Sequence, residues 1–221
     1  MVQAKAKTKA KGKLKDVEQT SEELRATILK VARKHFALHG LQGASLKNIA
    51  EEAGVANSLL NYHFVDKNGL FEQCIELFAQ SRMEALGRLL AEPKTQEELK
   101  IRLELFVDEV IRSVLDDPYG FEIIQQELKA GNPMVFEIFK NTMLKSFNGV
   151  MLFFTQAQNN GLIHSALDPM ILATILFSST CDSSRKDVMA KTFFKVSFTQ
   201  PEWRQKFSHH VVTVMLNGVL K

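Results

Sequence analysis

The sequence predicts an all-α protein. Three observations on the chain of 221 residues support this fold class. Apolar residues recur at three- and four-residue spacing, which is the period of an amphipathic helix. Capping residues, glycines and prolines divide the chain at intervals typical of helix ends. No segment alternates between apolar and polar residues between hairpin turns, so no sheet is expected.

The composition is that of an ordinary globular protein, with 45% hydrophobic and 24% charged residues. No apolar run approaches the roughly 20 residues that span a bilayer, and the N-terminus lacks the apolar stretch of a secretory signal. We therefore expect no membrane partner. Cys74 and Cys181 are far apart and have no partner motif. Neither a disulfide framework nor a thiolate zinc site is expected from them, so we expect a cytoplasmic protein.

Residues 1–19 are predicted to form a disordered basic arm. Six lysines between Lys5 and Lys15 alternate with small residues, without the apolar periodicity of a packed element. The chain through Lys67 has 12 Lys and Arg against 7 Asp and Glu, whereas the rest has 16 against 18. The basic excess therefore lies where a module that binds a polyanion would be placed. The arm either contacts such a partner or only keeps the protein soluble.

Three helices are predicted next. Thr20 and Glu23 form a capping-box pattern at the start of the first, and Gly40 is placed to end it. A short second helix is expected to stop at Gly54. The stretch "SLLNYHF" at 58–64 forms the third helix directly after that glycine turn. Two short helices joined by a tight glycine turn are typical of a helix-turn-helix motif.

The third helix is predicted to have two different faces. Leu60 and Phe64 are four residues apart and should point inward, while Asn57 with Asn61 and Ser58 with Tyr62 form a polar face. Such a short helix gains little from a polar face that only meets water, so we expect this face to contact another molecule. The alternative is that each polar group is merely solvated and that Tyr62 only covers the core.

Residues 67–221 are predicted to form a larger helical domain after a helix-turn-helix domain at 20–66. We expect its helices at about 67–91, 95–115, 117–131, 133–161, 168–183 and 199–220. The last two carry apolar faces, and small residues at Ser178 and Ser179 would let two helices approach closely. The pair His209 and His210 has no Cys or carboxylate at ligand spacing, so no metal site is expected there.

Residues 20–75 resemble the N-terminal domain of the tetracycline-repressor (TetR) family of transcriptional regulators. The shared elements are "HFALHG", "SLKNIAEEAGV" and "LLNYHF", followed by Lys67 and Leu70. The final helix is similar to the dimerisation helix of the family. The resemblance implies a homodimer formed through the last two helices, bound to a double-stranded DNA operator and without enzymatic activity.

The resemblance also implies which residues contact DNA. The third helix would read and grip the major groove, the start of the second helix would approach phosphates, and a lysine after the motif would bind a phosphate. The residues at these positions are Ser45, Lys47, Asn57, Ser58, Leu59, Asn61, Tyr62, His63 and Lys67. Asn61 stands where the family commonly has Tyr. We therefore expect Asn61 to affect the choice of operator.

The family places an effector pocket in the larger domain, and the resemblance implies one here. Candidate lining residues are Phe106, Phe121, Gln125, Met143, Phe147 and Met151. Phe and Met line adaptable pockets well, but they also fill ordinary cores, so both interpretations remain open. Few ionisable groups lie among these residues, which favours a small apolar or aromatic effector. No cofactor and no metal ion are expected.

The function predicted from these features is sequence-specific regulation of transcription, as a repressor that a small effector releases from a palindromic operator. When bound to DNA, the protein would be associated with the nucleoid. One alternative is a sequence-neutral architectural DNA-binding protein without an effector. A helical enzyme is a poorer alternative, because the sequence has no phosphate-binding glycine loop, metal-ligand cluster or nucleophile elbow.

Overall fold

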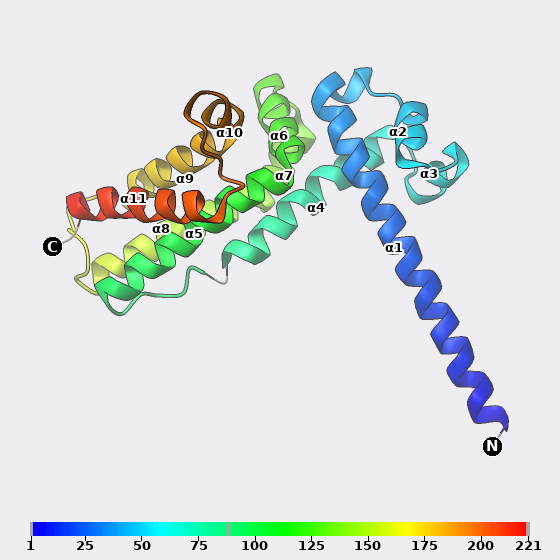
Figure 1. Ribbon diagram of the computed structural model, residues 1–221, viewed down its shortest axis with the longest axis horizontal. Helices are drawn as coiled ribbons and strands as arrows, with labels where there is room; N and C mark the ends of the chain where they lie inside the picture. The colour runs from blue at the N-terminus through cyan, green and yellow to red at the C-terminus, as the bar shows by residue number, and fades with distance from the viewer. Residues whose placement is uncertain (1, 88, 220–221) are drawn as a thin grey trace. The chain divides into compact units, whose positions relative to one another are not determined.

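The computed structural model describes residues 2–87 and 89–219, with side chains described except at 2–20, 81–86, 143 and 218–219. Within these residues the chain forms helices α1–α11 and one π-helical segment, η1, and no β-strand (Figure 1). The predicted all-α class is therefore confirmed. The chain divides into two compact units, Met1–Ile75 and Glu76–Lys221.

The first unit contains three complete helices and the beginning of a fourth. These are α1 (Val2–Gly43), α2 (Leu46–Ala53), α3 (Asn57–His63) and α4 (Lys67–Gly87), which continues into the second unit. Apolar side chains from all four helices are buried in one core. This core contains Ile28, Leu29, Ala32, Phe36, Ile49, Ala50, Leu60, Phe64, Leu70, Phe71 and Cys74. The rings of Phe36 and Phe71 meet edge to face, with centroids 5.0 Å apart.

Helix α1 begins earlier than predicted. It starts at Val2, so Thr20 is not its N-cap, and the backbone of residues 2–19 is helical where the sequence analysis expects a disordered arm. Alanine and lysine are strong helix formers, and a helix propagates readily from a part that is already packed. Gly40 interrupts the helix with φ 66° and ψ 174°, at the predicted position of the helix end.

The division between the two units lies inside α4. The first unit extends to Ile75, whereas the sequence analysis places the domain limit between residues 66 and 67. Leu70, Phe71 and Cys74 belong to the core of the first unit, and the Cys74 thiol donates to the carbonyl oxygen of Leu29 at 3.7 Å. The first turns of α4 are therefore part of the helix-turn-helix domain.

The second unit is a bundle around α5. Its helices are α5 (Gln96–Asp116), α6 (Pro118–Ala130), α7 (Pro133–Asn141), α8 (Met143–Asn159), α9 (Pro169–Arg185), α10 (Asp187–Met189), η1 (Ala190–Phe194) and α11 (Pro201–Val219). Helix α5 packs against α6, α9 and α11. Its buried face includes Leu99, Leu103, Phe106, Val107, Val110 and Ile111, which follow helical spacing.

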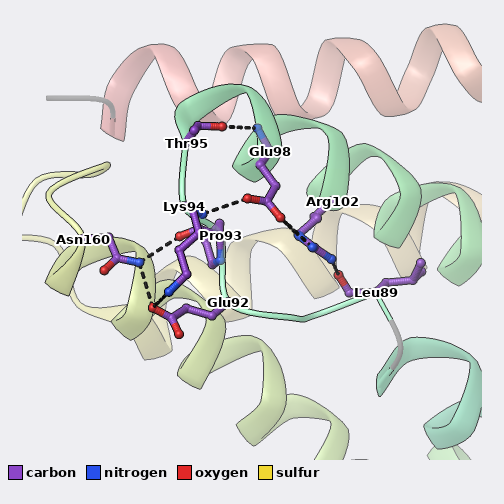
Figure 2. Close-up of polar contacts among 8 residues, drawn as sticks. All are labelled: Leu89, Glu92, Pro93, Lys94, Thr95, Glu98, Arg102 and Asn160. Atoms are coloured by element: carbon purple, nitrogen blue, oxygen red, sulfur yellow. Dashed lines mark hydrogen bonds and ion pairs between the residues drawn. The ribbon is translucent and has the colours of Figure 1, made fainter.

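Polar contacts fasten the start of α5 to the end of α8 (Figure 2). The hydroxyl of Thr95 accepts from the amide of Glu98 at 3.1 Å, and Arg102 Nη2 donates to Oε1 of Glu98 at 2.6 Å. Asn160 follows α8, and its side-chain amide donates to the carbonyl oxygen of Pro93 at 2.8 Å. The predicted helix start at Thr95 is therefore confirmed, and the preceding loop is held in place.

The single helix predicted over residues 133–161 is wrong, because α7 and α8 are separate. The break is at Thr142, whose φ is −123° and ψ is −79°. Its hydroxyl donates to the carbonyl oxygen of Ile138 at 2.5 Å, a local bond that competes with the regular helix. Helix α10 and η1 follow α9 and were not predicted.

Helix α6 comes very close to a side chain of α4 at Gly120. A Cβ atom added to Gly120 would lie 2.4 Å from Cδ2 of Phe78 on α4, within the second unit. Phe78 is buried, with 4% of its surface exposed. Only glycine at position 120 allows this contact without a shift of the ring.

Candidate nucleic-acid interface and ligand cavity

The turn between α2 and α3 has the geometry expected of a helix-turn-helix. Helix α2 begins after Ser45, whose Oγ accepts from the amide of Asn48 at 3.4 Å. Gly54 ends the helix with φ 69° and ψ 30°, a left-handed conformation that glycine adopts without a steric cost. The amide of Val55 then donates to the carbonyl oxygen of Ala50 at 3.0 Å. These contacts fix where α3 begins.

Helix α3 presents a buried and an exposed face, as predicted. Leu60 and Phe64 are 0% and 1% exposed, whereas Tyr62 is 83% exposed. The side chains of Asn57, Ser58 and Asn61 are exposed, and those of Leu59 and His63 are half-buried. The polar groups proposed to read DNA are therefore accessible on one short helix. Their contact with DNA stays a prediction.

The exposed surface continues beyond α3. Val65 follows the helix and is 95% exposed, close in sequence to Tyr62. The sequence analysis did not select Val65 as a candidate contact residue. Its exposure next to a helix-turn-helix adds an apolar group to the candidate interface.

The candidate phosphate-binding residues are in three different environments. Ser45 is half-buried and caps α2. Lys47 is exposed, and its Nζ lies 3.9 Å from Oε1 of Glu51. Lys67 is half-buried, and its Nζ donates to the carbonyl oxygens of Gln42 at 2.9 Å and Ala44 at 3.3 Å. Lys67 therefore ties the end of α1 to the start of α4 and keeps one N–H donor for another partner.

A charged contact joins α1 to α2. Glu52 on α2 accepts from Lys34 Nζ at 2.6 Å and lies 2.9 Å from His35 Nε2. The hydrogen bond from Lys34, and after it the contact with His35, lowers the pKa of the Glu52 carboxyl below its ordinary value. Glu52 thus helps to hold the helix that precedes the glycine turn.

Another contact supports the end of α3. The guanidinium of Arg25 lies 5.9 Å from the centroid of the Phe64 ring, a distance at which a cation interacts with an aromatic face. The same guanidinium donates to Oε1 of Gln73 on α4 at 2.6 Å. Phe64, which closes α3, is therefore contacted by a side chain of α1 that α4 holds in place.

The second unit contains a cavity of about 620 Å³, within the usual range for small-molecule sites. It lies among α6, α7, α8 and α9, with Ala79 of α4 also in its wall. Its larger apolar lining residues are Phe121, Ile124, Phe139, Leu144, Phe147 and Phe177. Its polar lining residues are Gln125, Ser146, Thr174, Ser178, Asp182 and Arg185.

Three of the predicted effector-binding residues line this cavity: Phe121, Gln125 and Phe147. Phe106 does not, because it is fully buried in the core, with its ring 5.4 Å from that of Phe177. Met151 also packs against this core instead of lining the cavity. Met143 was also predicted to bind the effector, but its side chain is not among those that the structure describes.

The sequence analysis missed the wall that α9 contributes. Residues 174, 177, 178, 181, 182 and 185 all line the cavity and repeat at helical spacing. The helical spacing can be read from the sequence, but the residues at these positions are both polar and apolar. A mixed stripe of this kind does not show whether it faces solvent, a partner or a cavity.

Several large apolar side chains of the second unit are exposed. On the predicted dimerisation helices these include Met170, Ile171 and Ile175 of α9 and Val214 of α11. Val188, Met189, Phe193 and Phe194 of α10 and η1 are also exposed. Contiguous exposed apolar surface is typical of an interaction site, so these residues are candidates for one. The short α10–η1 segment thus adds an unpredicted apolar region to the chain.

The part of the chain that the structure describes has neither a candidate metal site nor a candidate membrane span. No group of three or more His, Cys, Asp and Glu side chains in that part of the chain could hold a metal ion. No helix in the same part is long and apolar enough to cross a membrane. Cys74 and Cys181 are buried free thiols, and burial raises the pKa of Cys181 to about 11.

The sequence is similar to bacterial transcriptional regulators. Residues 28–74 match the family described as bacterial regulatory proteins, tetR family. The HTH-type transcriptional repressor AcnR of Corynebacterium diphtheriae is 32% identical over 90 residues, 37% of this chain and 47% of that protein. The chain thus spans about half of that relative. AcnR of Corynebacterium glutamicum is 27% identical over 163 residues, which cover 62% of this chain and 86% of that protein.

Solved structures share the fold over most of the chain. The ketosteroid transcriptional regulator KstR2 of Mycobacterium tuberculosis has a TM-score of 0.68 and 18% identity, covering 89% of this chain and 95% of that one. FadR of Bacillus subtilis, in complex with stearoyl-CoA, has a TM-score of 0.65 and 20% identity, covering 87% and 98%. At these identities the likeness shows the fold alone.

Proposed function

Because the chain belongs to the tetR family of bacterial regulatory proteins, we propose that it is a sequence-specific DNA-binding regulator of transcription. It acts as a repressor that a small effector releases from a palindromic operator. The observation that carries this proposal is the outward face of α3. Asn57, Ser58, Asn61 and Tyr62 are exposed there on a helix that Leu60 anchors in the core.

The exposed groups suit the major groove. The side-chain amides of Asn57 and Asn61 can each bond N6 and N7 of an adenine. Tyr62 and His63 suit phosphate oxygens, and exposed Val65 or half-buried Leu59 suits a thymine methyl group. The reading groups carry no formal charge, apart from a protonated His63. Lys47 and Lys67, at the starts of α2 and α4, supply positive charge for phosphates.

A homodimer would bring two copies of α3 to one operator. The exposed apolar residues of α9 and α11 support a self-complementary interface in which both helices of each protomer form a four-helix arrangement. The two recognition helices would then enter successive major grooves, about 34–36 Å apart. This spacing requires an operator with two related half-sites.

The cavity of the second unit supports an effector. Its wall is rich in phenylalanine, and its volume of about 620 Å³ suits a small, largely apolar or aromatic molecule. The names of KstR2 and of the FadR complex connect those proteins with a ketosteroid and with stearoyl-CoA, and both of these molecules have a large apolar part. An effector releases DNA only to the extent that it binds the released state more tightly than the DNA-bound state.

Selection of genomic fragments by the purified protein tests the DNA-binding proposal. The expected result is a small set of fragments that share a palindrome and bind far more tightly than bulk DNA. Affinity for them should fall steeply with salt, because lysines displace counterions from phosphates. If all fragments bind equally, the sequence-neutral architectural function is correct and the proposed function is wrong.

A further inference from the structure

We propose that the cavity of the second unit takes an elongated amphiphile, with its apolar body against the phenylalanine wall and its carboxylate bound by Arg185. This inference rests on the proposed effector-binding role of the cavity and adds the chemical class of the ligand. Arg185 lines the cavity at the C-terminal end of α9. The sequence analysis favoured an apolar effector because it did not place any cation there.

The two sides of the cavity differ in chemistry. Helices α6, α7 and α8 contribute mainly aromatic and aliphatic side chains, including Phe121, Phe139 and Phe147. Helix α9 contributes a stripe that begins at Thr174 and ends at Arg185. A helix rises about 1.5 Å per residue, so this stripe is about 16 Å long. A ligand in contact with the whole stripe is therefore elongated and mainly apolar, with polar groups along one side.

The two charged residues of the stripe differ in their partners. Asp182 also lines the cavity, but its carboxylate is paired with Lys186, which directly follows α9. The hydrogen bond from Lys186 lowers the pKa of Asp182, and the Arg185 guanidinium adds a weaker attraction. The main partner of the Asp182 carboxylate is therefore a cation outside the lining. The side chain of Arg185 is exposed, and its guanidinium makes no hydrogen bond or ion pair with any residue in the part of the chain that the structure describes. Its guanidinium is therefore the cation of the lining that remains for a ligand.

The chemistry of a guanidinium selects the ligand group. Its planar arrangement of N–H donors binds a carboxylate through two parallel hydrogen bonds. A neutral apolar ligand offers this exposed cation no hydrogen-bond acceptor, and a cationic ligand would be repelled by it. Gln125 and Ser178 also lack a described hydrogen-bond partner and could bond to polar atoms along the ligand.

Displacement of the neutral fluorescent dye N-phenylnaphthylamine from the intact protein tests the inference. The competitors are dodecanoate, dodecanol and dodecylamine, which have the same alkyl chain and differ in their charge. The wild-type protein should prefer dodecanoate to dodecanol by about tenfold, the lower end expected for a charged hydrogen bond. Arg185→Gln should remove this preference and leave the affinity for dodecanol unchanged.

Arg112→Gln is the matched control, because Arg112 is an exposed guanidinium on α5 that does not line the cavity. This variant should keep the preference for dodecanoate. An unchanged preference in Arg185→Gln overturns the inference, as does a wild-type preference for dodecylamine, which would assign the anchoring role to Asp182.

A third variant separates this inference from the proposed function. Ser178→Phe places a ring in the cavity and should weaken the binding of the dye and of all three competitors. If Ser178→Phe binds the dye and dodecanol as tightly as the wild-type protein does, the cavity is not their site. Both the effector proposal and this inference then fail. If Ser178→Phe blocks dodecanol but Arg185→Gln keeps the carboxylate preference, only the inference fails.

Discussion

Lys67 has two possible roles, and replacing it with methionine separates them. Its ammonium donates to two backbone carbonyl oxygens near the end of α1, those of Gln42 and Ala44. The family resemblance assigns a phosphate contact to the same residue. Lys67→Met keeps most of the length of the side chain but removes all its donors, so both roles are lost together and each can be measured.

The structural role sets the expected loss of stability. A hydrogen bond from a charged group contributes about 1.5–3 kcal/mol when it is protected from water. The bond to Ala44 is partly buried and the bond to Gln42 is exposed, so only the first should approach that range. We expect Lys67→Met to lower the free energy of unfolding by about 1–3 kcal/mol. Urea unfolding with an unchanged m-value measures this loss.

The DNA-binding role sets the expected change in salt dependence. Each phosphate contact contributes about 0.9 to the slope of log affinity against log salt, so losing one lysine from each protomer should reduce the slope by about 2. Fluorescence anisotropy of a labelled operator over a salt series measures this slope. Lys47→Met is the control for stability, because the ion pair of Lys47 with Glu51 is long and exposed and contributes little to stability. Its own phosphate contact would be lost, so it should reduce the salt slope by a similar amount.

Either result can contradict the reasoning. If Lys67→Met unfolds at the wild-type urea concentration, the two carbonyl contacts do not stabilise the unit. If the salt slope is unchanged while stability falls, Lys67 is a structural residue and makes no phosphate contact. Lys47→Met should leave the free energy of unfolding unchanged. A large decrease in this variant would show that exposed ion pairs of lysine stabilise the unit more than expected.

Three further changes test other parts of the first unit. Asn61→Ala should weaken operator binding by about 1–3 kcal/mol more than non-specific binding, and an equal loss in competition assays would exclude base reading. Gly54→Ala should destabilise the protein by about 1 kcal/mol in urea unfolding, because φ there is 69° while a methyl group meets no atom within 4 Å. The folded-state pKa of Glu52 is lowered, so its stabilising effect should be full above about pH 4.5 and lost as the pH falls through the lowered pKa. Glu52→Gln should therefore flatten the acid side of the stability curve, and an unchanged curve would contradict this reasoning.

The helix ends were predicted where the signal is local. Asp117 and Asp168 were expected to start helices, and their carboxylates accept from the amides of Gly120 and Met170. Gly131 was expected to end α6, and it adopts a left-handed conformation there. Caps and left-handed glycines depend on a few neighbouring residues, so they can be inferred without knowledge of the tertiary structure.

The unpredicted features depend on residues far apart in the sequence. The break at Thr142 has no glycine or proline beside it, and the adjoining helices have similar apolar character. Phe106 and Phe177 are both apolar helix residues, but only Phe177 lines the cavity. The direction in which each side chain points is decided by the packing of neighbouring helices. The family resemblance therefore implied an effector pocket, but composition and spacing did not assign most of the wall of the cavity.

The contact between Gly120 and Phe78 has a consequence for how this chain can diverge. Even a methyl group at position 120 would overlap the ring, so the two positions can change only together, with a smaller residue at 78 accompanying any side chain at 120. Their sequence neighbours, Ala79 and Phe121, both line the cavity. A paired exchange would thus move two wall residues without altering either of them. Natural variation at positions 78 and 120 would therefore change which molecules fit the cavity, even among proteins whose lining residues are identical.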